Sequence, residues 1–156
     1  MSKGGEIVHA FTTEFNGLAR QLVNEIELSL PVDLHNSEVP TLFKTHALWD
    51  TGATNSVITA DTVAKLGLKP ISMTQVQHAG GVSTQNIHLV NIYLPNKVAI
   101  PFVQVTECED ISGNFGAIIG MDIISIGDFA VTNFQGKTTL SFRIPSVEKI
   151  NFIPKN

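Results

Sequence analysis

The chain has 156 residues, a length typical of a single domain, and 43% of them are hydrophobic, which is enough to form one solid core. Its net charge is −4, only 15% of its residues are charged, and it has no basic cluster of the kind that follows a phosphate backbone, so nucleic acid is not expected as a partner. No apolar run resembles a signal peptide or approaches the roughly 20 residues needed to cross a bilayer, which predicts a cytoplasmic protein with no membrane partner.

The predicted elements are mostly short strands. Alternating or β-branched apolar residues predict strands, in chain order, at residues 26–32, 42–49, 57–59, 71–78, 82–94, 98–106, 117–119, 129–134 and 137–144. Thr59 is expected to cap a short helix that runs through Lys65 and stops at Gly67, and residues 121–126 predict a second brief helix. Pro101 lies inside one predicted strand, which indicates an edge or a bulge there.

This pattern favours an all-β fold, closed or sandwiched, over a fold in which strands and helices alternate. We expect residues 1–156 to form one domain. Residues 1–40 form an N-terminal extension with three open interpretations, namely a dimerisation arm, a substrate mimic or an ordinary extra hairpin. The tail at 145–156 is too apolar to be a simple disordered tail.

The strand predicted at 42–49 runs directly into Asp50, which is followed by Thr51 and Gly52. A carboxylate placed directly after a buried strand is energetically costly unless the site uses its charge. Gly52 allows the backbone to turn tightly and leaves its N–H open toward a ligand. The tripeptide alone is equally compatible with a plain turn in which the Asp50 side chain caps its own loop.

The surrounding segments resemble the signatures of retropepsin-like aspartic peptidases. Asp-Thr-Gly-Ala at 50–53 follows an apolar strand, and Ile-Ile-Gly at 118–120, before a short helix, resembles the second signature of that family. Between them lies a hairpin with a glycine-rich tip at 80–81, where the family has its flap. The resemblance covers roughly residues 42–144 and implies an all-β, closed acid-protease-type barrel with one or two short helices.

The resemblance also implies an activity, that of an aspartic endopeptidase that acts on a peptide or protein substrate without a metal or another cofactor. The implied catalytic residues are Asp50, Thr51 and Gly52, with Asp50 as the carboxylate that activates water. The implied substrate-binding residues are Ala53, Gly80, Gly81 and Val82.

Peptide hydrolysis by this chemistry requires two carboxylates that share a proton, one acting as base toward water and the other donating to the scissile carbonyl. The chain has one Asp-Thr-Gly and no second Asp-Thr-Gly or Asp-Ser-Gly. A two-fold homodimer supplies the second carboxylate, because the axis places Asp50 against Asp50 of the partner. By resemblance, Thr51 would hydrogen-bond across that axis and the tail from Pro145 onward would pair between subunits.

Four other residues are candidates for a structural or functional role. Asp122 is expected to cap the short helix rather than take part in chemistry. Trp49 stands where the family usually has a smaller aliphatic residue, so it either narrows a pocket or fills the core. Cys108, the only cysteine, is expected to be unreactive because its acidic neighbours disfavour the thiolate. His46 and Asp50 would be about 13 Å apart along a strand, which argues against a metal pair.

Three functions therefore stay open at this point. The first is an active aspartic peptidase. The second is a catalytically inactive retropepsin-like dimer that binds peptides or acts as a scaffold, because a fold does not guarantee an activity. The third is an unrelated β-barrel ligand carrier, a monomer with one internal cavity in which Asp50 is only a turn residue.

Overall fold

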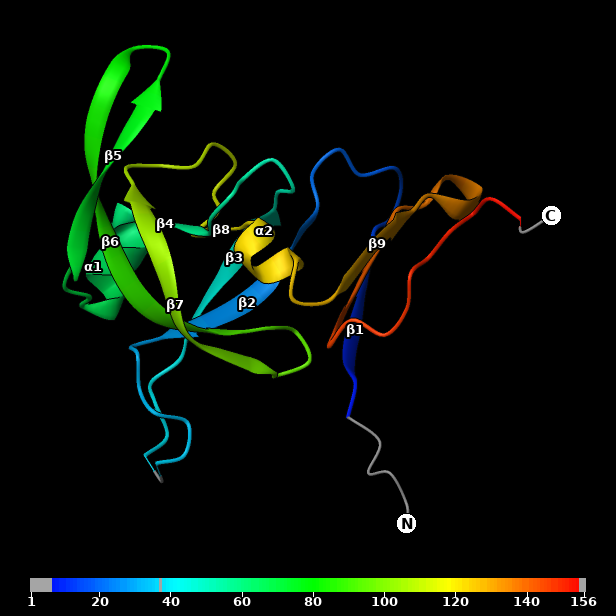
Figure 1. Ribbon diagram of the computed structural model, residues 1–156, viewed down its shortest axis with the longest axis horizontal. Helices are drawn as coiled ribbons and strands as arrows, with labels where there is room; N and C mark the ends of the chain where they lie inside the picture. The colour runs from blue at the N-terminus through cyan, green and yellow to red at the C-terminus, as the bar shows by residue number, and fades with distance from the viewer. Residues whose placement is uncertain (1–6, 37, 155–156) are drawn as a thin grey trace.

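The computed structural model describes residues 7–36 and 38–154, and this part of the chain contains ten strands, two short α-helices and one 3-10 helix (Figure 1). The elements in chain order are β1 (His9–Glu14), β2 (Val23–Ser29), β3 (Phe43–Trp49), β4 (Val57–Thr59), α1 (Ala60–Leu66), β5 (Ser72–His78), β6 (Gly81–Tyr93), β7 (Ala99–Cys108), β8 (Ala117–Ile119), α2 (Met121–Ile124), β9 (Asp128–Thr132), η1 (Phe134–Gly136) and β10 (Thr139–Ile144). The expected all-β class is confirmed.

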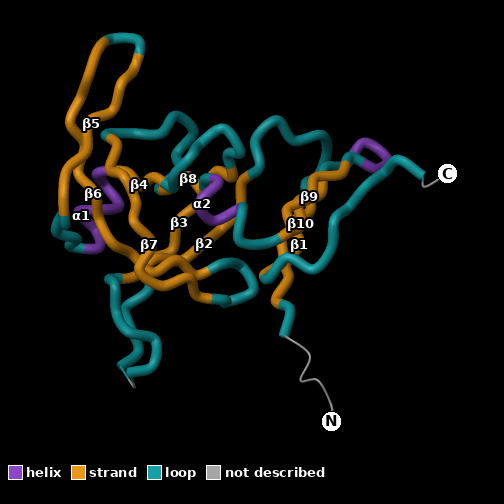
Figure 2. Tube along the Cα trace, viewed as in Figure 1, coloured by secondary structure: helices purple, strands orange, loops and turns teal. Residues whose placement is uncertain are grey.

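Seven of the strands form one sheet in the order β2-β3-β8-β4-β7-β6-β5. An additional pairing between β2 and β6 closes six of these strands into a ring and leaves β5 outside it. Figure 2 shows β5 and the first part of β6 extending beyond the ring as a long hairpin. The residues that fill the core and are at most 1% exposed include Ile26, Leu28, Ile58, Val90, Ile92, Val105 and Ile119.

The ring brings the two sequence signatures together. β3 pairs in parallel with β8, so that Trp49 lies opposite Ile119. β8 pairs on its other side with β4, the strand to which the chain returns after the Asp50 turn. Because β3 and β8 run in the same direction side by side, the turn after Trp49 and the glycine after Ile119 lie at the same end of the sheet.

The other three strands form a separate sheet in the order β1-β10-β9. β1 pairs with β10 from His9 opposite Ile144 to Glu14 opposite Thr139. β2, by contrast, belongs to the ring, where it pairs with β3 and β6. Within the described residues, β1 and β2 therefore do not form a hairpin with each other, because they pair with partners in different sheets.

Most local predictions are confirmed. Thr59 caps α1 by accepting a hydrogen bond from the Thr62 N–H, and Gly67 ends the helix with φ = 65°. The register between β6 and β7 shifts between Val90 and Ile92, which places a bulge beside Pro101 as expected. The first predicted strand at 26–32 is instead β2, displaced toward the N-terminus, because Pro31 has no N–H with which to continue a ladder.

The segment after β10 forms no strand within residues 145–154 of the described chain. It is held instead by the carboxylate of Asp128 on β9, which accepts hydrogen bonds from the Ser146 hydroxyl and from the Val147 N–H. The Arg143 guanidinium joins the same carboxylate at 2.7 Å. We call Asp128, Arg143, Ser146 and Val147 the tail clamp.

Candidate active site

The turn after β3 holds the Asp50 carboxylate by its own backbone. The Asp50 N–H donates to the Ile119 carbonyl of β8 at 2.9 Å, which fixes the start of the turn to the second signature. The Gly52 N–H donates to Asp50 Oδ1 at 2.8 Å, and the Ala53 N–H donates to the Asp50 carbonyl at 3.2 Å. The side chain thus has one oxygen fixed by a backbone donor, as a carboxylate oriented for chemistry requires.

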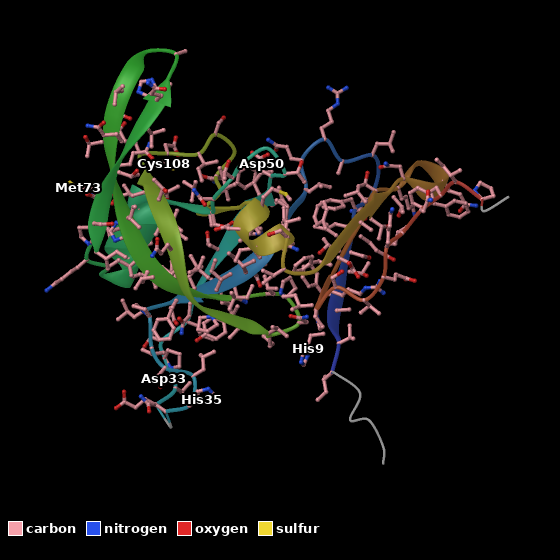
Figure 3. The ribbon with its side chains drawn as sticks, in the orientation of Figure 1. His9, Asp33, His35, Asp50, Met73 and Cys108 are labelled. Atoms are coloured by element: carbon pink, nitrogen blue, oxygen red, sulfur yellow. The ribbon has the colours of Figure 1, made fainter. Side chains whose placement is uncertain are left out.

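The same turn faces outward. Asp50 is half-buried, whereas Thr51 and Gly52 are exposed. Among the residues that the structure describes, no donor reaches the second carboxylate oxygen, Oδ2, and Figure 3 shows Asp50 near the surface. A carboxylate with one oxygen fixed and the other open can accept a proton from water or share one with a second carboxylate.

The second signature, at 118–120, and the start of α2 hold the turn through backbone contacts. The Met121 N–H donates to the Ala53 carbonyl at 2.8 Å, and the Asp122 N–H donates to the Thr54 carbonyl at 3.2 Å. At Gly120 the two segments touch so closely that a Cβ atom there would lie 2.8 Å from the Ala53 carbonyl oxygen and from the Asn55 backbone. A glycine is therefore required at 120 by close approach of the backbone.

Asp122 makes a longer-range contact than the one expected. The N-cap of α2 is Gly120, and Asp122 Oδ1 accepts the Ile123 N–H at 3.0 Å in the first turn of that helix. The Asp122 carboxylate also accepts hydrogen bonds from the Ser56 N–H at 2.9 Å and the Ser56 hydroxyl at 2.8 Å. The Ser56 hydroxyl oxygen in turn accepts from the Gly120 N–H at 3.1 Å. These bonds join the far end of the Asp50 turn to the start of α2.

The sequence alone does not indicate the role of Ser56. It is 1% exposed, and a buried hydroxyl of this kind needs partners that satisfy it. A serine four residues after Gly52 carries no local signal of that role, because its partner Asp122 lies 66 positions further along the chain.

The hairpin of β5 and β6 carries the remaining predicted site residues at its tip. His78 pairs with Gly81, so Ala79 and Gly80 form a two-residue turn. The Gly80 N–H donates to His78 Nδ1 at 3.1 Å, and Gly81 has φ = 124°, a conformation that disfavours any residue with a Cβ. Figure 1 shows this tip standing away from the rest of the molecule.

The structure therefore unites some of the predicted site residues and separates others. Asp50 to Ala53 lie in one turn that contacts 119–122. The tip residues Gly80, Gly81 and Val82 are exposed, and no hydrogen bond in the described part of the chain joins them to the Asp50 turn.

Ionisable residues lie near the base of the hairpin. His88 in β6 is 1% exposed, and its Nε2 lies 2.7 Å from a carboxylate oxygen of Glu107 in β7. This hydrogen bond is the main cause that lowers the pKa of the Glu107 carboxyl, and burial opposes it. Burial raises the pKa of the neighbouring Cys108 thiol, and the negative charges of Asp110 and Glu107 add to that effect. The expected disfavouring of the thiolate is confirmed, with burial as the larger cause.

Two other kinds of feature are absent from the described residues. In residues 7–36 and 38–154, no group of three or more His, Cys, Asp or Glu side chains is arranged to hold a metal ion. No helix in the same ranges has the length and apolar character needed to cross a membrane.

Comparison with known proteins adds to this geometry. A family model described as aspartyl protease matches residues 38–123, more than half of the chain. A retropepsin-like aspartic protease from Rickettsia conorii has 12% identity and a TM-score of 0.53, covering 92% of this chain and 99% of its own. The EIAV protease complexed with the inhibitor HBY-793 has 19% identity and a TM-score of 0.47, covering 71% and 90%.

The retroviral protease-like domain of Ddi1 from Leishmania major has 22% identity and a TM-score of 0.41, and it covers 68% of this chain and 78% of its own. No curated protein sequence matches the chain. The likeness to the Rickettsia structure shows that the fold is retropepsin-like.

Proposed function

This chain belongs to the aspartyl protease family, and from that membership we propose that it is an aspartic endopeptidase whose active site forms from two Asp50 residues across a homodimer two-fold axis. The observation that carries the proposal is the Asp50 carboxylate itself. One of its oxygens accepts the Gly52 N–H at 2.8 Å, while no donor among the described residues reaches the other. A turn that only capped itself would not need the support that 119–122 provide.

Two chains are needed because one chain supplies one carboxylate. The sequence contains a single Asp-Thr-Gly, and the exposed position of Thr51 and Gly52 leaves the turn open to a second copy. In such a dimer the two carboxylates would lie close enough that both could not ionise easily, and the pair would titrate as a unit. The ionised member would take a proton from water as the neutral member donates to the scissile carbonyl.

The other predicted residues take their roles in the same dimer. We propose that Thr51 hydrogen-bonds across the axis, and that Ala53 contacts the substrate backbone next to the reacting bond. The flap tip at 80–82 would close over a bound peptide and offer it backbone donors. In the single chain this tip stands apart from the turn, which suits an element that closes only on substrate (Figure 3).

The experiment that tests the proposal is the substitution Asp50→Asn. We expect it to lower peptide cleavage by about 10²–10⁴-fold, because it removes the group that transfers the proton. Cleavage by the unmodified protein should be favoured by acid and inhibited by pepstatin. The matched control is Asp61→Asn, the same change at an exposed carboxylate that pairs with Lys65 on the surface of α1. Undiminished cleavage by Asp50→Asn would refute the peptidase.

A mixing experiment tests the shared site. When a fixed amount of active protein is mixed with an excess of Asp50→Asn protein, mixed dimers contain one Asp50 and should be inactive. Activity should therefore fall as the excess rises, whereas addition of Asp61→Asn protein should raise it. If Asp50→Asn protein leaves the activity of the active chain unchanged, each chain works alone. A dimer without any cleavage would favour the peptide-binding scaffold.

A further inference from the structure

The two sheets of the molecule meet at Trp49, the residue directly before Asp50. Trp49 is 3% exposed, so it fills core rather than narrowing a pocket. Its ring contacts one phenylalanine from each strand of the three-stranded sheet. The centroid distances are 5.7 Å to Phe11 in β1, 5.2 Å to Phe142 in β10 and 5.9 Å to Phe129 in β9. The Phe129 ring is stacked on the indole with an interplanar angle of 19°.

A polar contact reinforces this junction. The Trp49 indole N–H donates to Asn24 Oδ1 at 2.8 Å, and the Asn24 amide donates to the Thr13 hydroxyl of β1 at 3.2 Å. Both ends of the indole are therefore held, one by rings and one by a hydrogen bond. A buried Trp whose N–H is satisfied has little freedom to change its position.

Side-chain contacts carry the connection between the sheets. Within the described residues, no strand of the three-stranded sheet pairs with a strand of the seven-stranded sheet. Trp49 ends β3 in the ring, and its aromatic partners all lie in the other sheet. The next residue along the backbone, Asp50, begins the turn that carries the open carboxylate. A shift of the indole would thus move the start of that turn directly through the backbone.

From this geometry we infer that Trp49 is a positioning residue through which the three-stranded sheet fixes the Asp50 turn. The inference rests on the proposed function, since the turn matters only if Asp50 reacts. It makes β1, β9 and β10 part of the catalytic unit, although Asp50 belongs to the other sheet. A misplacement of about 1 Å at a reacting group can lower a rate by about 10²-fold, so small shifts of this junction are enough to matter.

The test removes the stacked ring without touching Trp49 or Asp50. Phe129→Leu should lower kcat by about three- to ten-fold with little change in KM, because the turn is displaced while the flap is not. Phe129→Tyr keeps the ring and should restore kcat. Trp49 is the only tryptophan in the chain, so its fluorescence reports the junction directly and should change in Phe129→Leu and not in Phe129→Tyr.

A matched control separates positioning from general loss of stability. Ile92→Val removes a methylene from a core position of β6 that is 1% exposed and pairs with Ile100 of β7. It should lower the melting temperature while leaving kcat unchanged. If Phe129→Leu does not fold, Phe11→Leu in β1 makes the same test from another strand.

A second measurement does not depend on catalysis. The Gly52 N–H donates a hydrogen bond to the Asp50 carboxylate, so its hydrogen-exchange rate reports how firmly the turn is held. This rate should be faster by about tenfold in Phe129→Leu than in Ile92→Val, with each variant measured the same number of degrees below its own melting temperature. Equal Gly52 exchange and equal kcat in these two variants would overturn the inference. If the unmodified protein cleaves no peptide, the proposed function fails, and the Gly52 exchange still decides whether Trp49 positions the turn.

Discussion

The Asp50 turn and the flap tip carry the two halves of the proposed active site, and they are built in opposite ways. The turn at 50–56 is tied to residues 119–122 by backbone hydrogen bonds and by the Ser56–Asp122 pair. The tip at 78–82 is held by its own hairpin pairing and by a single bond from the Gly80 N–H to His78. Figure 1 shows the turn against the body of the molecule and the tip outside it.

This difference agrees with the separate functions proposed for the two elements. A reacting carboxylate must be held within a fraction of an ångström, so its support comes from several distant segments. A binding element that closes on substrate must open again, so it has few contacts that resist movement. Substitutions in the turn should therefore change stability and kcat together, whereas substitutions at the tip should change mainly KM.

The largest effect is expected from a glycine-to-alanine substitution beside the turn, compared with the same substitution at the tip. Gly120→Ala places a Cβ atom 2.8 Å from rigid backbone atoms of the turn, and such overpacking should lower the free energy of unfolding by about 3 kcal/mol. At Gly80 a Cβ atom would meet only the His78 side chain at 3.2 Å, which can move aside. Denaturant titrations of both variants, with kcat and KM, check this contrast. Equal losses of stability would remove the distinction between turn and tip.

A smaller effect is expected at Asp122. Asp122→Asn weakens the hydrogen bonds accepted from Ser56, and we expect the free energy of unfolding to fall by about 1–2 kcal/mol with a lower kcat. Asp61→Asn is again the control, since its exposed pair with Lys65 should contribute less than about 0.5 kcal/mol.

A double-mutant cycle with Ser56→Ala shows whether the two residues act together. Their combined loss of stability should be less than the sum of the single losses. Additive losses would mean that the Ser56–Asp122 pair does not hold the turn.

At the tip itself, Gly81→Ala should raise KM with kcat nearly unchanged. An alanine at φ = 124° is strained by about 1 kcal/mol, and the tip would rearrange rather than transmit the strain to the core. Gly17→Ala, where the added Cβ meets nothing within 4 Å and φ is not positive, should leave both constants unchanged. A drop in kcat as large as that of Asp122→Asn would show that the tip also positions the chemistry.

The smallest effect concerns the tail clamp, which should loosen at low pH while the Asp50 turn stays closed. Hydrogen bonds from the Ser146 hydroxyl and the Val147 N–H, together with the Arg143 guanidinium, hold the pKa of the Asp128 carboxyl well below its usual range. Because this pKa is lowered on folding, the stabilisation is complete above about pH 4 and is lost as the pH falls below it.

Hydrogen-exchange protection of the Val147 N–H should therefore decrease as the pH falls below about 4, while protection of the Ser56 N–H persists. Asp128→Asn should remove the pH dependence at Val147, and Asp33→Asn, at an exposed carboxylate outside the clamp, should not. Loss of both protections at the same pH would mean that the turn and the tail open together.

Many of the strands and helices of this fold could be predicted from the sequence, but fewer of the long-range contacts that hold them could. The strand before Asp50, the capped α1, the flap hairpin and the bulge near Pro101 were all predictable, because each depends on a few neighbouring residues. β1 was not predicted, because its short run from His9 to Glu14 becomes a strand through pairing with β10, about 130 positions away. The homodimer, the peptide substrate and the cytoplasmic location stay predictions.

The positions of the proposed catalytic carboxylate and of the hairpin tip could be read from the sequence alone, since Asp-Thr-Gly after an apolar strand and Gly-Gly in a hairpin are local patterns. The contacts that hold them are visible only in the folded molecule. Asp122 binds Ser56 as well as the first turn of its own helix, and Trp49 joins the two sheets rather than lining a pocket. Both roles come from partners far away in sequence, 66 positions for Ser56 and Asp122 and 80 positions for Trp49 and Phe129, and no local pattern records such contacts.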